Sequence, residues 1–407
     1  MFRPKNIQGI YLYLVFGNTL AASFIWGINT LFLLDAGLSN FQAFLANGFF
    51  TLGMVMFEVP TGVVADTFGR RTSYLLGAFT LAVSTALYLL MWQIHGPFWG
   101  WAVSSILLGL GFTFFSGALE AWLVDALKAT NFEGSLDSVF AKGQIAGGSA
   151  MLIGSIAGGI IAQLTNLGVP YIIRAAVLLL NFATAFFFMK DLGFIPKKGE
   201  RPFTEMKKVF KASIDHGFKN PPVRWVMLAA PFTVGVSFYI FYALQPFLLE
   251  LYGDPKAYWI AGLVAAIAAS AQIAGGVVGP WIKRMFNKRT TALIVCTFLT
   301  GLILVGVSTA QNFWLALILI FIWGLFFASF TPIRQTYLNG IIPSEQRATV
   351  LSFDSLMGSS GGIVIQPVLG KAADVWGYAT SYALSSLFQF AALPFLFLAK
   401  RTKAESD

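Results

Sequence analysis

Long apolar runs follow one another along the 407-residue chain, and short polar connections separate them. Most runs reach about 20 residues, the length that a helix needs to cross the apolar core of a bilayer. Barrel strands are about half as long, so the pattern excludes a membrane β-barrel. No small-residue cleavage site follows the first run, which is therefore expected to be a retained span. Twelve spans are predicted, near 9–34, 41–65, 73–94, 97–124, 143–164, 170–189, 223–249, 257–282, 290–310, 313–338, 348–370 and 377–399.

The composition agrees with this pattern. Hydrophobic residues make up 57% of the chain and charged residues 11%, against about a quarter charged residues in ordinary soluble proteins. The predicted class is an all-α integral membrane protein. The single Cys296 lies inside an apolar run, and His95 and His216 lie in connections without metal-ligand spacing. Phosphate-loop, HExxH and GxSxG patterns are absent from the sequence, so we expect no enzyme, metal or cofactor.

The net charge of +9 is explained by membrane topology. If the N-terminus, the C-terminus and the loops after even-numbered spans share one side, that side holds all but three of the 27 Lys and Arg. The exceptions are Arg174, Lys256 and Lys371. The positive-inside rule then places both termini in the cytoplasm. The charge therefore does not indicate a nucleic-acid partner, and a monomer in the lipid bilayer is expected.

One long connection, residues 190–222, divides the spans six and six. Apolar residues from Phe203 to Phe218 recur at helical spacing between lysines, which predicts either an amphipathic helix on the membrane surface or a solvated linker helix. We predict an N-terminal six-helix bundle at 1–189, a linker at 190–222 and a C-terminal bundle at 223–407. A shift of 214 residues aligns the second span with the eighth, which supports a duplicated half.

The connection after the second span carries the densest polar signature. Its motif residues are Gly62, Asp66, Gly69, Arg70 and Arg71. With the twelve spans and the long central loop, this stretch resembles the major facilitator superfamily. The resemblance implies two pseudo-symmetric six-helix bundles, and transport of a small molecule by alternating access.

Each motif residue has an expected role. Gly69 permits a tight turn, and Gly62 allows a close helix approach. Asp66 can accept hydrogen bonds from a helix N-terminus, and Arg70 can pair with the Asp125 carboxylate.

The resemblance further implies that this loop packs near the start of the eleventh span, beside Asp354 or Ser352. Such a cluster would form a cytoplasmic gate that locks the outward-facing state. The alternative is that Arg70 and Arg71 only set the topology.

Ionisable residues inside spans are candidates for function because burying a charge is costly. Glu58 lies about 12 Å deeper than Asp66 along a helix; it either exchanges protons or holds the helix near Pro60.

Two further acids and bases occupy spans. Glu120 and Arg334 match in the repeat, so they form a salt bridge, contact the substrate, or pair separately with other groups. Glu120 is also a proton-coupling candidate. Arg174 near the end of the sixth span is explained by snorkelling.

Glycines give helices smooth faces for close packing. Gly143, Gly147, Gly154 and Gly158 form a stripe on the fifth span, and the eleventh has Gly358 and Gly362. The segment GSIAGG at 154–159 also resembles part of the signature of the family's drug:proton antiporters. That signature's proline is replaced by Ser155, and the antiporters' arginine in the fourth span is absent.

Aromatic and amide side chains can line an apolar cavity for an amphipathic compound. The substrate-cavity candidates are Phe24, Trp26, Asn29, Glu58, Glu120, Phe238, Tyr239, Tyr242, Gln245, Gln272 and Arg334. The expected function is proton-coupled efflux of a small lipophilic or amphipathic compound from a bacterial inner membrane. The alternatives are metabolite uptake or facilitated diffusion, flipping of a lipid, and a transport-inactive sensor.

Overall fold

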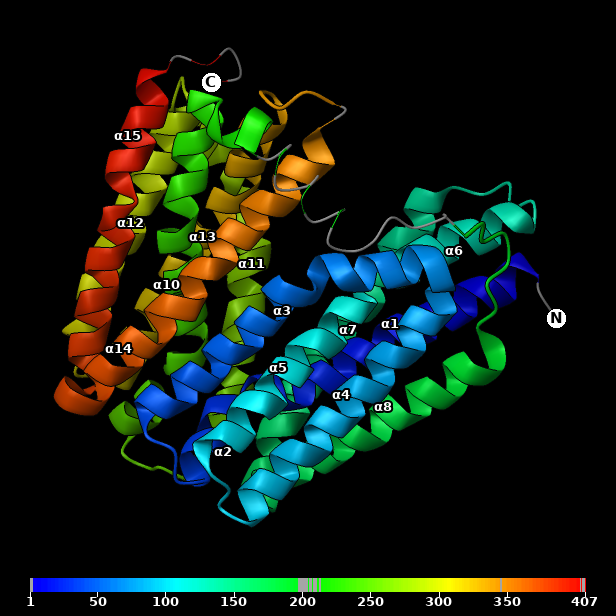
Figure 1. Ribbon diagram of the computed structural model, residues 1–407. Helices are drawn as coiled ribbons and strands as arrows, with labels where there is room; N and C mark the ends of the chain where they lie inside the picture. The colour runs from blue at the N-terminus through cyan, green and yellow to red at the C-terminus, as the bar shows by residue number, and fades with distance from the viewer. Residues whose placement is uncertain are drawn as a thin grey trace. The chain divides into compact units, whose positions relative to one another are not determined.

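The computed structural model describes residues 3–196, 204, 207, 211, 214–344, 346–402, 404 and 407, and this part of the chain is helical without strands. Its first eight helices are α1 (Pro4–Trp26), α2 (Asn29–Asp35), α3 (Asn40–Phe68), α4 (Arg70–Gln93), α5 (Phe98–Phe115), α6 (Ala118–Ala129), α7 (Leu136–Leu164) and α8 (Val169–Phe188). After the π-helix Ile214–Phe218 follow α10 (Pro221–Tyr252), α11 (Trp259–Met285), α12 (Arg289–Ser308), α13 (Phe313–Asn339), α14 (Arg347–Ala391) and α15 (Leu393–Arg401) (Figure 1).

Eleven helical segments in the described residues are long and apolar enough to cross a membrane. The last of them, Thr349–Arg401, has 53 residues, which corresponds to about 80 Å of straight helix and far exceeds one bilayer crossing. Gly377 divides this segment, because its φ of 80° and ψ of 167° are not helical. Each part is long enough for one crossing, as the predicted spans 348–370 and 377–399 require.

The helix is interrupted within two of the predicted spans, which the apolar pattern did not indicate. The first span is interrupted at Gly27–Ile28, between α1 and α2. The fourth is interrupted at Ser116–Gly117, between α5 and α6, where Gly117 has the left-handed φ of 66°. A left-handed residue leaves the helical hydrogen-bond pattern, and glycine adopts this conformation at little cost.

Most of the amphipathic helix predicted at 203–218 lies outside the described residues, including Phe203, Met206, Val209 and Phe210. The described end of this stretch, Ile214–Phe218, is a short π-helix.

The chain forms two compact units. Unit 1 comprises 1–37, 49–205 and 256–265, and unit 2 comprises 38–48, 206–255 and 266–407. The start of α3 therefore belongs to unit 2, and the start of α11 belongs to unit 1. These exchanged segments follow the sequence repeat, because a shift of 214 residues lays 42–48 on 256–262. The bundle boundaries 1–189, 190–222 and 223–407 remain a prediction.

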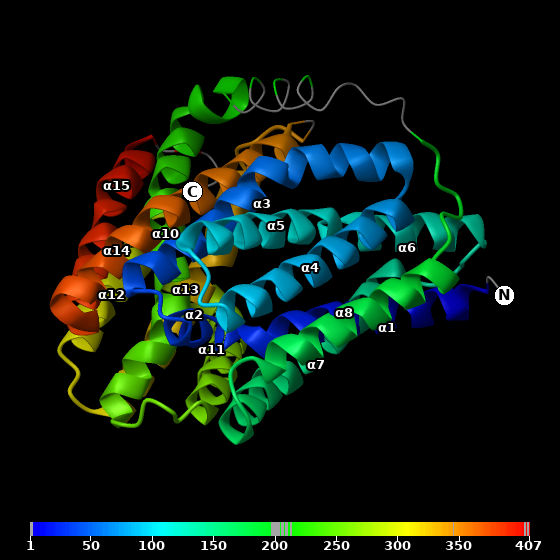
Figure 2. The same ribbon diagram turned by 60° about the horizontal axis from the view of Figure 1, so that its bottom comes forward.

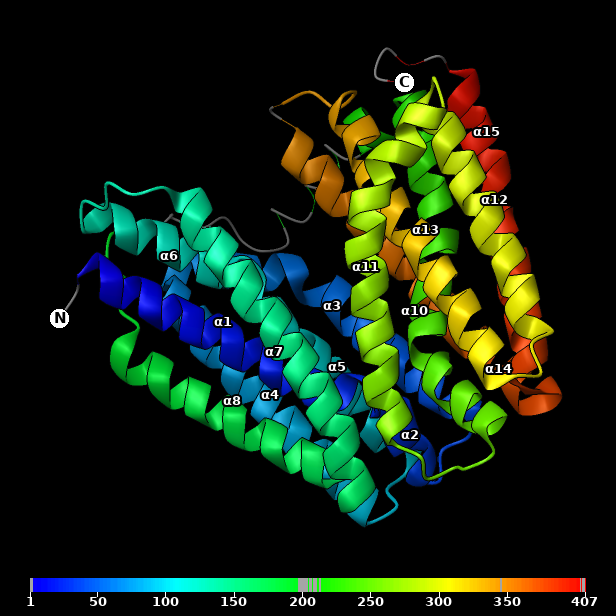
Figure 3. The ribbon, with the colours of Figure 1, turned by 180° about the vertical axis from the view of Figure 1, so that it is seen from behind.

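In unit 1, α1 and α7 pack along the predicted glycine stripe, and they lie side by side in Figures 1 and 3. A Cβ added at Gly143 would meet Tyr11, and one at Gly154 would meet Ser23 at 2.8 Å. A Cβ at Gly158 would lie only 2.1 Å from the Phe24 carbonyl oxygen. The stripe therefore lets two backbones approach closely, as predicted.

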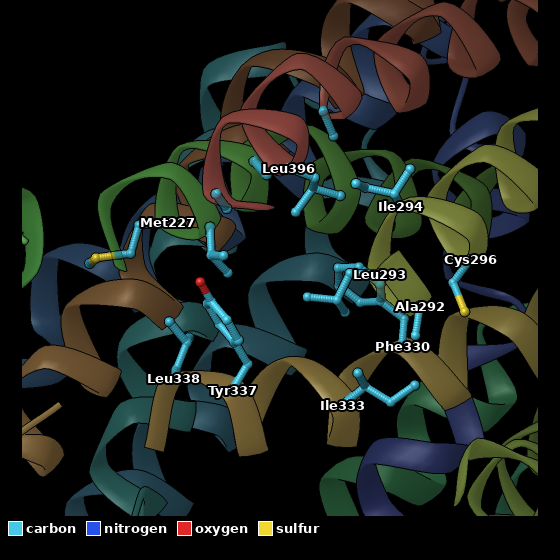
Figure 4. Close-up of a cluster of buried hydrophobic side chains, with 14 of the residues drawn as sticks. Met227, Ala292, Leu293, Ile294, Cys296, Phe330, Ile333, Tyr337, Leu338 and Leu396 are labelled. Carbon is cyan, nitrogen blue, oxygen red and sulfur yellow. The ribbon is translucent and has the colours of Figure 1, made fainter. Parts of the chain in front are cut away.

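The core of unit 2 is formed by apolar side chains from α10, α12, α13 and α15, several of which are shown in Figure 4. Cys296 is buried in this core, so it has a packing role. Beside the core, α10 packs on α14, where a Cβ at Gly361 would meet the Pro231 carbonyl oxygen at 1.9 Å. Predicted Gly358 and Gly362 face the same helix, through Val234 and Phe238.

The start of α3 is fixed within unit 2 by Asp374. Its two carboxylate oxygens accept hydrogen bonds from the backbone amides of Asn40 and Phe41, each at 2.8 Å. Tyr378 donates a hydrogen bond to the Asn40 side chain. A carboxylate at this position satisfies free amides at the helix N-terminus and complements the helix dipole.

The glycine stripe can be tested at one position. We expect Gly158→Ala to lower the free energy of unfolding by about 1–3 kcal/mol, because its methyl group forces α1 and α7 apart. Gly148→Ala is the matched control on the same helix, since a Cβ there meets no described atom within 4 Å. Thermal unfolding of the purified variants measures the difference. Equal stability of the two variants would show that the close contact is unimportant.

Candidate functional site

The motif loop between α3 and α4 is a sharp turn at Gly69, whose φ is 106° and whose ψ is 154°. This confirms the turn that the sequence predicts, since residues with side chains rarely adopt such angles. Just before the turn, Asp66 forms a salt bridge with Arg70 at 2.6 Å. The predicted pairing of Arg70 with Asp125 was wrong, because no ion pair joins the two in the described part of the chain.

Asp191, in the segment after α8, holds the N-terminus of α4. Its Oδ1 accepts a hydrogen bond from the Arg71 backbone amide at 2.9 Å. A Cβ at Gly69 would lie 2.3 Å from Asp191 Oδ2, so glycine is also needed there for space. The sequence analysis assigned this acceptor role to Asp66. Asp191 was missed because it lies 120 residues from Arg71 and belongs to no local motif.

The end of α8 and the segment after it contact both motif arginines. Arg71 donates a hydrogen bond to the Phe186 carbonyl at 2.7 Å and lies over the Phe186 ring. Arg70 lies over the ring of Phe194, 5.9 Å from its centroid. A cation over an aromatic face is attracted by the ring quadrupole. Phe186 and residues 191–194 therefore form a clamp on the motif loop, which we call the linker clamp.

Asp125 contributes its backbone to this region. Gly193 packs so closely on α6 that a Cβ there would lie 2.7 Å from the Asp125 carbonyl oxygen. Gly62, expected to allow a close helix approach, has no described atom within 4 Å of an added Cβ, so that approach is not seen.

Burial raises the pKa of the Asp191 carboxyl above its ordinary value, while the Arg71 amide and the charges of Arg71 and Arg70 lower it without cancelling the effect. A half-buried carboxylate loses solvation that its hydrogen bonds only partly replace. The folded protein therefore holds a proton on Asp191 more tightly than the unfolded chain does.

Glu58 on α3 meets the interruption of the fourth span. The Ser116 hydroxyl donates a hydrogen bond to Glu58 Oε1 at 2.7 Å. Ser116 is the first residue after α5, and Gly117 follows with its left-handed backbone. Glu120 lies in the first turn of α6, just beyond the interruption. The structure thus brings the two proton-coupling candidates to one broken span.

A cavity of about 230 Å³ lies inside unit 1, among α1, α4, α5, α6 and α8. Two predicted cavity residues, Trp26 and Glu120, belong to its lining. The complete lining is Val15, Asn18, Thr19, Ala22, Trp26, Leu81, Phe112, Phe115, Leu119, Glu120, Arg174 and Leu178. It is mostly apolar, with one acid and one base, which is typical of a site for an amphipathic molecule.

The prediction that Arg174 snorkels was wrong. Instead of snorkelling to the membrane surface, its side chain is buried, with 1% of the residue exposed. The Arg174 Nε donates to Thr85 Oγ1 at 3.0 Å, and Nη1 donates to the Ala21 carbonyl at 3.2 Å. These contacts draw α8 toward α4 and α1; Figure 2 shows α4 between α5 and α8.

Arg334 has its partner within unit 2. Its Nη1 and Nη2 donate to the two carboxylate oxygens of Asp354 at 2.7 and 2.5 Å. Both side chains are largely buried. A bidentate pair of this kind fixes both groups. Arg334 therefore pairs with Asp354, whereas the sequence analysis suggested a pair with Glu120. Asp354, which was expected near the gate motif, has Arg334 as its partner.

The remaining cavity candidates lie in varied surroundings. Asn29 is buried and accepts a hydrogen bond from Tyr171 at 2.9 Å. Tyr239 is also buried, with its hydroxyl 2.5 Å from Ser381 Oγ. Gln245 is buried and donates to the Phe241 carbonyl, and Gln272 is exposed on α11. Asn29, Tyr239 and Gln245 are thus parts of the packed interior.

Tyr242 on α10 is half-buried and packs its ring edgewise on that of Phe241. Phe24 is buried against α7. A larger cavity, of about 420 Å³, lies at the ends of α1 and α8 near Lys190, but none of its lining residues is acidic. In the described residues, no three His, Cys, Asp or Glu side chains gather closely enough to hold a metal ion.

Variants of Asp191 test the linker clamp. We expect Asp191→Ala to lower the free energy of unfolding by about 0.5–2 kcal/mol, because α4 loses its capping acceptor. Asp191→Asn keeps an oxygen acceptor and cannot ionise. Since the folded-state pKa is raised, the stabilisation from Asp191 is complete below the ordinary pKa and is lost as pH rises through the folded value. Relative to Asp191→Asn, the unaltered protein should therefore lose stability from acidic to neutral pH; a constant difference would contradict this.

Breaking the Arg334–Asp354 pair gives a second test. We expect Asp354→Asn to cost about 3–5 kcal/mol of stability, because it leaves a buried guanidinium without its carboxylate. Asp215→Asn is the control, since its 2.6 Å pair with the exposed Lys219 should contribute at most about 1 kcal/mol. Unfolding of the purified proteins measures both. Similar losses in the two variants would show that the pair at Arg334 is no stronger than a surface pair.

Comparisons with known proteins identify the family. The sequence model described as Major Facilitator Superfamily matches residues 12–363 and 273–407. The multidrug resistance protein MdtG of Salmonella typhimurium is 26% identical over 332 residues, covering 80% of this chain and 76% of that protein.

Solved structures agree on the fold. The nucleoside transporter NupG superposes with a TM-score of 0.78 at 13% identity, covering 98% of this chain and 100% of that one. A bacterial homologue of the human lysosomal transporter Spinster superposes with a TM-score of 0.75 at 15% identity, covering 98% and 97%. The chain therefore belongs to the Major Facilitator Superfamily and is a multi-pass membrane transporter of small molecules, with no enzymatic function.

Proposed function

We propose that this transporter exports a small lipophilic or amphipathic compound across a bacterial inner membrane in exchange for protons. The observation that carries the proposal is the pair of acids, Glu58 and Glu120, at the interruption of the fourth span beside an apolar cavity. The similarity to a multidrug resistance protein supports efflux. The proposal includes twelve spans, cytoplasmic termini and a monomeric transporter driven by the proton gradient.

Through the contact between Glu58 and Ser116, protonation of Glu58 can change the direction of α6. An ionised Glu58 accepts a strong hydrogen bond from the Ser116 hydroxyl. Protonation removes the charge and weakens this bond, which frees the residue where α5 ends. Because Gly117 interrupts the helix, α6 can change direction there with little cost in packing within α5. Glu120 and Leu119 on α6 line the cavity, so its shape would follow the protonation state.

The motif loop has the character of a gate that opens and closes. The exposed fractions of the Asp66 and Arg70 side chains are 35% and 18%, so their salt bridge is partly open to solvent, and Asp66 can exchange Arg70 for water. The linker clamp attaches this loop to the end of α8 through Asp191 and Phe186. We propose that a movement of α8 or of the linker is transmitted to the loop by these contacts.

Transport by purified protein in proteoliposomes tests the proposal. A panel of labelled lipophilic compounds is added outside vesicles with an acidic interior. We expect at least one compound to accumulate inside while protons leave, and we expect nigericin, which removes the pH gradient, to abolish accumulation. Transport that is equal with and without the gradient would indicate facilitated diffusion. Accumulation only with the opposite gradient would indicate proton-coupled uptake. A lipid probe reaching the opposite leaflet would indicate flipping.

Glu58→Gln tests the coupling residue. We expect gradient-driven accumulation to fall at least about tenfold, because the amide cannot bind a proton, while the protein keeps its unfolding temperature. Glu133→Gln is the control, since Glu133 is exposed in the connection before α7. Gradient-driven accumulation that survives Glu58→Gln would remove Glu58 as the coupling acid.

A further inference from the structure

Arg174 is a buried cation without a carboxylate partner. Its side chain is buried, and in the described part of the chain no salt bridge reaches it. Asp35, on the neighbouring α2, accepts a hydrogen bond from Trp92. An uncompensated charge in an apolar interior is costly, so such a residue is retained only where it does something.

The hydrogen bonds of Arg174 leave one nitrogen of the guanidinium without an acceptor. Nε and Nη1 have acceptors in Thr85 and Ala21, but no described atom accepts a hydrogen bond from Nη2. A guanidinium has five N–H groups, and the Nη1–Nη2 edge matches the two oxygens of a carboxylate. The contacts with Thr85 and Ala21 hold the plane of the group, and the ring of Phe112 lies 5.9 Å from its central carbon. The group is therefore oriented before any ligand arrives.

Arg174 also belongs to the lining of the 230 Å³ cavity. Around it the lining is apolar, with Leu81, Phe112, Leu178 and Trp26. A volume of 230 Å³ is below the roughly 300–1,000 Å³ of complete ligand pockets, so the cavity fits one end of a substrate. The end of the substrate that enters this cavity would contact apolar side chains and the Arg174 guanidinium.

We propose that this cavity is a subsite for the anionic end of the substrate, in which Arg174 binds a carboxylate. The proposal rests on the proposed function and specifies its substrate as an amphipathic organic acid with a flat or branched apolar group next to the carboxylate. Transfer of the carboxylate to Arg174 gives the guanidinium a direct ion-pair partner, which the described residues do not supply. The carboxylate replaces its hydration by bidentate, charge-assisted hydrogen bonds to the guanidinium.

The charge of Glu120 affects how tightly the cavity binds a carboxylate. It lines the same cavity as Arg174, yet no salt bridge joins the two side chains. A carboxylate bound in this cavity is therefore repelled by the charge of Glu120, and removal of that charge strengthens binding of an acid.

Binding of a matched pair of probes tests the subsite. Naphthalene-1-carboxylate and naphthalene-1-carboxamide have nearly the same shape and differ in charge. Equilibrium binding to the full-length protein in phosphatidylcholine nanodiscs is measured by titration calorimetry. We expect the carboxylate to bind at least about tenfold more tightly than the amide, as charge-assisted hydrogen bonds require. Arg174→Met should reduce this ratio to about one, because carboxylate binding weakens far more than amide binding, and Arg174→Lys should retain part of the ratio.

Glu120→Gln should increase carboxylate affinity without changing amide affinity, opposite in sign to the effect of Arg174→Met. Equal binding of the two probes by the unaltered protein, or no binding of either, would overturn the proposal. So would a carboxylate preference that survives in a folded Arg174→Met protein. If that variant does not fold, the ratio of carboxylate to amide affinity in the unaltered protein still tests the proposal. Proton-driven transport of other compounds, combined with no preference for the carboxylate, would refute the subsite and leave the proposed function standing.

Discussion

A charged group in an apolar interior is stable only when another group compensates it, and this constraint organises the polar residues of the transporter. In unit 2 the compensation is complete at Arg334, which Asp354 holds through two hydrogen bonds. In unit 1, Arg174 has a hydroxyl and a carbonyl as partners, and no carboxylate among the described residues. The two units thus differ in how their buried arginines are paired: Arg334 has a carboxylate partner, and Arg174, which lines the cavity, does not have one among the described residues.

The interruption of the fourth span lets the helix that carries Glu120 move independently of α5. A continuous helix would carry Glu120 rigidly with α5, whereas the left-handed Gly117 separates the two helices. Glu58 reaches this joint through Ser116. In the proposed exchange, a proton on Glu58 and a ligand beside Glu120 act on the same short segment, which is what coupling between two ligands requires.

The apolar pattern predicted the spans well, because twenty-residue apolar runs have few alternatives in a membrane. It failed at Gly27–Ile28 and Ser116–Gly117, since the apolar residues continue through both interruptions. The Gly69 turn was predictable from a local motif. Asp191 was not, because it reaches Arg71 across 120 residues. Arg174 shows a third kind of limit: its depth was readable from the sequence, but the direction of its side chain depends on how α8 packs on α4 and α1.

The proposed exchange of a substrate for protons is tested most directly by proton movement that the substrate itself drives. Proteoliposomes are prepared with a pH-sensitive dye inside and equal pH on both sides, and a transported compound is added outside. Exchange predicts that protons leave as the compound enters, so the interior becomes alkaline, and that Glu58→Gln abolishes the change. An interior that becomes acidic, or that keeps its pH while the compound enters, would contradict the account.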